Sequence, residues 1–75
     1  MILPTKHIST RRSLLGVGAA VLKRLREPQT VSRLWEHVRD EPEVRNFERF
    51  VLALDLLYAL GAVEFKDGLL RRASR

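Results

Sequence analysis

The segment from Asn46 to Arg72 limits the possible folds of this chain more than any other stretch. Its first part carries apolar residues at helical spacing, and Gly61 is suited to ending that helix. Its second part alternates apolar and polar residues on both sides of Asp67-Gly68, a favoured two-residue hairpin turn. A helix followed by a hairpin is the second half of a winged helix-turn-helix domain. We therefore predict a mostly α fold with a small β-hairpin, that is, three helices plus a wing.

The preceding residues supply the other two helices and an arm. Prolines, which lack an amide donor, separate the segments, and apolar spacing predicts helices over about residues 9–26 and 30–40. We expect the first helix to begin near Ser9 or Thr10. Residues 1–8 have no regular period and are expected to form an N-terminal arm, either as an edge strand or docked on a partner. The predicted organisation is thus an arm, 1–8, and one domain, 9–75.

Apolar residues form one stripe on each predicted helix, and we expect these stripes to make the core. The stripes are Leu14, Val17, Val21, Leu22 and Leu25; Val31, Leu34, Trp35 and Val38; and Phe47, Phe50, Val51, Leu54, Leu57 and Tyr58. Glycine is unfavourable inside a helix. Gly16 and Gly18 therefore indicate either close approach by another element or simple tolerance.

The opposite side of the third helix is unusual for a helix that reads DNA. It carries Glu48, Arg49, Leu52, Asp55, Leu56, Ala59 and Leu60. A groove-reading helix needs cations and amides there to reach bases and phosphates, whereas this side has one arginine and two acids among apolar residues. We predict a partner-binding surface of Arg49, Leu52, Leu56, Ala59 and Leu60, together with Ile2 and Leu3 of the arm. Alternatively, the arm itself folds over this side.

Positive charge is concentrated elsewhere. The 75 residues include 14 Lys and Arg against nine Asp and Glu, a net charge of +5 that favours nucleic acid or an acidic protein as partner. The candidate nucleic-acid-binding residues are Arg11 and Arg12 at the start of the first helix and Lys66, Arg71 and Arg72 in the wing. Ordinary solubilising charge explains the wing residues equally well.

Several functional classes have little support in the sequence. There is no cysteine, and the two histidines lie thirty positions apart, so we expect no metal site and no cofactor. No serine has the setting of a catalytic nucleophile, which predicts a non-enzyme without a small-molecule substrate. No apolar run reaches the roughly 20 residues that span a bilayer. Ser9–Leu15 resembles the start of a twin-arginine export peptide, but Lys23 and Arg24 interrupt the apolar run, so we expect a cytoplasmic location without membrane contact.

Four segments of the sequence resemble a known family. They are MILPTKHI at the start, RSLLGVG from Arg12, TVSRLW from Thr30 and FVLALDLLYALGA from Phe50. Together they look like the small middle component, of the sixth type, of bacterial ABC-three component systems, and the likeness covers nearly the whole chain. It implies a small winged-helix protein encoded between a larger component and an SMC- or Rad50-like ATPase, in a cassette thought to defend against phage and plasmids.

The leading hypothesis is therefore a non-catalytic adaptor. It would bridge the ATPase, the larger component and, non-specifically, DNA. A free-standing winged-helix transcriptional regulator is the main alternative, and it predicts a dimer whose affinity for DNA falls steeply with salt. A small antitoxin-like binder is a third, and it predicts one stable toxin partner.

Overall fold

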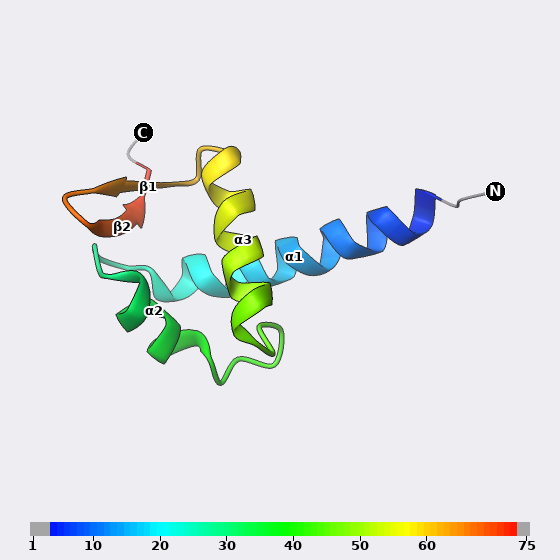
Figure 1. Cartoon of the computed structure of the whole chain (residues 1–75), viewed down its shortest axis with the longest axis horizontal. Coiled ribbons are helices and arrows are strands. Elements are labelled where there is room, and N and C mark those ends of the chain that lie inside the picture. The colour runs from blue at the N-terminus through cyan, green and yellow to red at the C-terminus, as the bar shows by residue number, and fades with distance from the viewer. Residues whose placement is uncertain (1–3, 74–75) are drawn as a thin grey trace.

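The computed structural model describes the backbone of residues 4–73 and the side chains of residues 12–73. Its elements are α1 (Pro4–Arg24), α2 (Val31–Val38), α3 (Phe47–Ala59), β1 (Val63–Lys66) and β2 (Leu69–Arg72) (Figure 1). Three helices followed by an antiparallel hairpin confirm the predicted winged-helix class.

Helix α1 differs most from the prediction. It begins at Pro4, so the expected start near Ser9 or Thr10 is wrong. Proline is favoured in the first turn of a helix, where its missing amide hydrogen has no intrahelical partner to lose. Residue 8, the predicted end of the arm, lies inside α1, while Ile2 and Leu3 lie outside the described residues. The first half of α1 projects away from the other elements (Figure 1).

The starts of α2 and α3 follow from local sequence. Thr30 Oγ1 accepts a hydrogen bond from the Arg33 amide at 3.1 Å, and Asn46 Oδ1 accepts one from the Arg49 amide at 2.9 Å. Such side chains satisfy amides that have no partner within the helix. After α3, Gly61 adopts a φ of +77°, a left-handed conformation that glycine adopts at little cost. These three predicted helix boundaries are confirmed.

The hairpin is attached to the helices through its second strand. Strands β1 and β2 pair with Phe65 opposite Leu70, and Asp67-Gly68 forms the turn with positive φ at both residues. On its other side, Leu70 exchanges two main-chain hydrogen bonds with Gln29, at 2.8 and 3.0 Å. The spatial order is therefore Gln29, β2, β1, which leaves β1 on the outside.

The core lies where the three helices meet the hairpin. Its buried members are Val17, Ala20, Val21, Leu25, Leu34, Val38, Val44, Phe50, Ala53, Leu54, Leu57, Val63 and Leu70. Trp35 packs beside this core, with its ring centroid 5.2 Å from that of Phe47 and 5.3 Å from that of Phe50. The predicted packing role of Trp35 is confirmed.

The buried face of α3 is not the predicted one. Ala53 is buried, whereas Phe47 is half-exposed and Tyr58 is 62% exposed. At 100° per residue, the centre of the buried face is rotated by about 50° from the predicted stripe. The reason is that α1 packs against the side of α3 that carries Leu57. A Cβ placed on Gly18 of α1 would lie only 3.1 Å from Leu57 Cδ2, so the close approach considered for Gly18 exists.

Candidate functional site

The side of α3 that faces away from the core carries no positive charge. Its exposed residues are Glu48, Leu52, Asp55 and Ala59. Leu52 is 45% exposed and Leu60, just after the helix, is 63% exposed. Leu56 was expected to be exposed but is half-buried, because the buried face is rotated toward it. We refer to Leu52, Leu56, Ala59 and Leu60 as the apolar strip.

Arg49, the one cation of α3, is directed toward the body of the protein. Its Nη2 donates hydrogen bonds to Ser13 Oγ of α1 at 2.6 Å and to the Glu43 carbonyl oxygen at 3.1 Å. Its Nε is buried. A guanidinium held in this way ties α3 to α1 and to the turn before α3. The structure thus gives Arg49 an intramolecular role that the sequence did not indicate.

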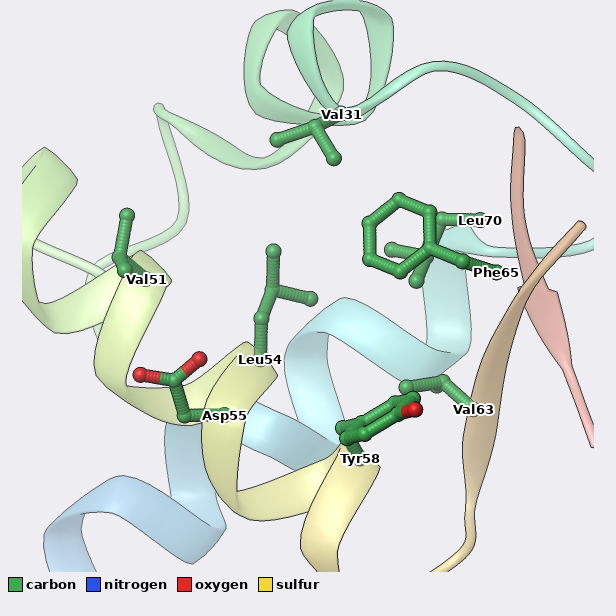
Figure 2. Close-up of a pocket in the computed structure, with 8 residues that line it drawn as sticks. All are labelled: Val31, Val51, Leu54, Asp55, Tyr58, Val63, Phe65 and Leu70. Carbon is green, nitrogen blue, oxygen red and sulfur yellow. The ribbon is translucent and has the colours of Figure 1, made fainter. Parts of the chain in front are cut away.

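A hollow of about 350 Å³ opens on the other flank of α3. Side chains from α2, α3 and both strands converge on it (Figure 2), namely Val31, Val51, Leu54, Asp55, Tyr58, Val63, Phe65 and Leu70. Seven of these eight side chains are apolar or aromatic, and Asp55 adds one carboxylate. Phe65 is 53% exposed, so an aromatic wall faces solvent. We refer to this feature as the wing hollow.

The sequence did not reveal the wing hollow, because its walls come from separate elements. Tyr58 was assigned to the core, and Phe65 was noted only as part of an alternating strand. The rotation of α3 brings Tyr58 to the surface beside the hairpin. The alternation in β1 was the available signal: it places Val63 and Phe65 on one face and Lys66 on the other.

The predicted nucleic-acid-binding residues are not gathered into one patch. Arg12 is exposed at the α1 side and Lys66 is exposed in the hairpin, while the Arg11 side chain lies outside the described residues. Arg71 pairs with Glu64 across the hairpin, Nε to Oε2, at 2.8 Å. Arg72 donates from Nε to the Leu22 carbonyl oxygen at 3.2 Å and from Nη2 to the same atom. Arg71 and Arg72 therefore have structural partners.

Arg45 is a basic residue that the sequence analysis did not select as a binding residue. It has a φ of +67° and lines a second hollow with Arg12, Ser13, Gly16, Pro42, Glu43 and Arg49. Within residues 12–73, no group of three or more His, Cys, Asp or Glu side chains is placed to hold a metal ion. Among the described residues, every helix is too short or too polar to cross a lipid bilayer.

A family model for the ABC-three component (ABC-3C) system Middle Component 6 matches residues 3–73. The chain belongs to this family. No curated protein and no solved structure matches it. The match to Middle Component 6 covers nearly the whole length of the chain, so it includes all three helices and the hairpin.

Membership of Middle Component 6 makes the chain one part of a system of several components, and its working state therefore includes partner proteins. As a middle component, it is not itself the ATPase. The surfaces of greatest functional interest in this Middle Component 6 chain are those that a partner protein can cover: the apolar strip and the wing hollow.

Proposed function

We propose that this Middle Component 6 chain is a non-catalytic adaptor that docks another component of its system through the apolar strip of α3. The observation that carries the proposal is the outward side of α3. A winged helix that reads DNA presents cations and amides on this helix, whereas here Leu52 and Leu60 are exposed beside Glu48 and Asp55. Phosphates are repelled by such a surface, and a protein partner gains by covering it.

The proposed partners are an SMC- or Rad50-like ATPase and the larger component of the same system. Family membership supports the presence of partner proteins, and the resemblance of the sequence supports their kind. DNA contact, on this proposal, is non-specific and is made by Arg12 and Lys66, whose charges have no ion-pair partner within residues 12–73. A role in defence against phage and plasmids is part of the proposal and rests on the family resemblance alone.

The test is co-purification of the tagged chain with the other components of its own system. The double substitution Leu52→Arg and Leu60→Arg places two charges on the strip at exposed positions, which keeps the core intact. We expect it to abolish capture of one component. Leu15→Arg is the matched control, because Leu15 is a leucine of similar exposure on α1.

The adaptor proposal fails if the wild-type chain captures no other component. It also fails if the wild-type chain is a lone dimer that shifts duplex DNA at about 150 mM salt, where charge interactions are strongly screened. The second result would instead establish a transcriptional regulator. Retained helical circular dichroism in the double variant distinguishes loss of docking from loss of folding.

A further inference from the structure

The wing hollow is a second surface, separate from the apolar strip. Around α3, the strip lies toward the α1 side and the hollow lies toward α2 and the hairpin, with Glu48 between them and Asp55 at the near edge of the hollow. Two large aromatic side chains of the hollow, Tyr58 and Phe65, are more than half exposed. Exposed aromatic walls around a concave apolar surface are typical of sites that receive the anchoring side chain of a partner.

We propose that the wing hollow binds an extended segment of a partner protein that carries a large apolar side chain next to a lysine or arginine. This inference rests on the proposed adaptor function and adds a second docking site, with the chemistry of its occupant. Three features support this occupant: the shape of the hollow, the charge at its side and the free edge of β1.

The shape fits a side chain of a protein. A volume of about 350 Å³ is at the lower end of the range of roughly 300 to 1,000 Å³ for ligand sites. Leu54 and Leu70, at its base, are buried, while the Phe65 and Tyr58 rings form its open walls (Figure 2). A hollow of this volume can hold an aromatic or leucine side chain, while the main chain of the partner stays at the surface.

The charge at the hollow is negative. Asp55 is exposed, lines the hollow and makes no ion pair with any residue between 12 and 73. Lys66, the nearest cation in sequence to Phe65, lies on the opposite face of the hairpin because side chains alternate along a strand. A lysine or arginine beside the apolar anchor would therefore find an unpaired carboxylate, and a phosphate would be repelled.

The free edge of β1 suits an extended segment. Both main-chain polar groups of Leu70 bond to Gln29, so Phe65 and Leu70 form a pair without mutual hydrogen bonds. The amide and carbonyl of Phe65 consequently point away from β2, toward the side where the sheet of the described residues has no further strand. Phe65 can thus offer its ring to the hollow and its main chain to an added strand, a common mode of peptide recognition.

The experiment is performed on the full chain co-expressed with the other components of its system. Asp55→Lys and Phe65→Ser alter exposed side chains of the hollow. Asp40→Lys makes the same substitution at an exposed aspartate after α2, outside both the hollow and the apolar strip, and Phe47→Ser removes another half-exposed ring outside the hollow. We expect each hollow variant to weaken capture of one component at least tenfold and each control to retain it. In the wild-type complex, hydrogen exchange at the Phe65 amide should slow.

Three outcomes overturn the proposal. One is assembly of the hollow variants as complete as that of the wild type. Another is equal loss in Asp40→Lys and Asp55→Lys, which would show that the effect comes from net charge alone. The last is that the chain alone forms a dimer and that Phe65→Ser converts this dimer to a monomer. A second copy of the chain would then be the occupant of the hollow. If the variants of the strip abolish capture while the hollow variants do not, the adaptor function stands and only the second site fails.

Discussion

Arg49 of α3 and Ser13 of α1 are joined by a 2.6 Å hydrogen bond across 36 positions of the sequence. This contact holds the only cation of α3 against α1. The outer side of the helix is left with apolar and acidic residues, which is the basis for proposing a protein partner there. Because this bond lies within the chain, a substitution at Arg49 is expected to change the stability of the fold and not the binding of a partner.

Replacing Arg49 with methionine should lower the free energy of unfolding. The substitution keeps a long apolar stem but removes the donors to Ser13 Oγ and the Glu43 carbonyl. Hydrogen bonds from charged groups contribute roughly 1.5 to 3 kcal/mol, and the partial exposure of Arg49 favours the lower end. Urea unfolding measures the loss, with Arg33→Met, at an exposed position of α2, as the control. An unchanged midpoint accompanied by lost capture would show that Arg49 acts through a partner.

The two glycines of α1 should respond differently to alanine. Nothing lies within 4 Å of a Cβ at Gly16, whereas a Cβ at Gly18 meets Leu57 Cδ2 at 3.1 Å. Gly16→Ala should therefore gain about 1 kcal/mol of stability from helix propensity. Gly18→Ala should gain less, and Gly18→Leu should be destabilising because α3 has to move. Thermal unfolding of the three variants gives the order, and equal gains at both positions would contradict the packing of α1 on α3.

Substitution by alanine should destabilise the chain to very different extents at two leucines of α3 that are two positions apart. Leu54 is 8% exposed and Leu52 is 45% exposed. Truncating a buried leucine costs about 2 to 5 kcal/mol, whereas an exposed one costs little. Leu54→Ala should therefore destabilise the chain strongly, and Leu52→Ala should leave its melting temperature nearly unchanged. A strong effect of Leu52→Ala on the isolated chain would show that the strip is covered by the chain itself.

Two basic residues of the wing, Arg72 and Lys66, allow a role in folding to be separated from a role in nucleic-acid contact. Arg72→Met removes the donors to the Leu22 carbonyl near the end of α1. Hydrogen bonds from charged groups contribute roughly 1.5 to 3 kcal/mol, and because Arg72 is exposed we expect a loss at or below the lower end of this range. Lys66→Met should leave stability unchanged, because Lys66 is exposed and unpaired among the described residues. If Lys66 contacts DNA as proposed, Lys66→Met should instead weaken the binding of duplex DNA to the assembled complex. The affinity should then also depend less steeply on salt concentration, because one phosphate contact is lost.

The sequence correctly predicted the starts of α2 and α3 and the hairpin turn, because residues close together in the sequence determine each of them. Thr30 and Asn46 bond the amides of their own helices, and Asp67-Gly68 closes its own hairpin, so each signal is complete within a few residues. The family, too, could be identified from the sequence. The start of α1 could not, because the mixed apolar and basic residues at its beginning have no helical period.

Tertiary contacts account for the remaining differences. Which side of α3 is buried depends on where α1 crosses it, and the periodicity of α3 alone allows a range of faces. The rotation toward Ala53 exposes Tyr58 and half-buries Leu56. It also directs Arg49 to Ser13. The wing hollow combines α2, α3 and the hairpin, so no single segment carries a signal for it.

The attachment of the hairpin bears on how the chain unfolds. Leu70 is bonded to Gln29 through both of its main-chain groups, and Arg72 is bonded to the last turns of α1. The wing cannot detach unless it breaks the Gln29 pair and uncovers the end of α1, and Leu70 itself would leave the core. Wing and helices should therefore lose structure in a single cooperative transition, without a stage in which a loose wing accompanies an intact helical body.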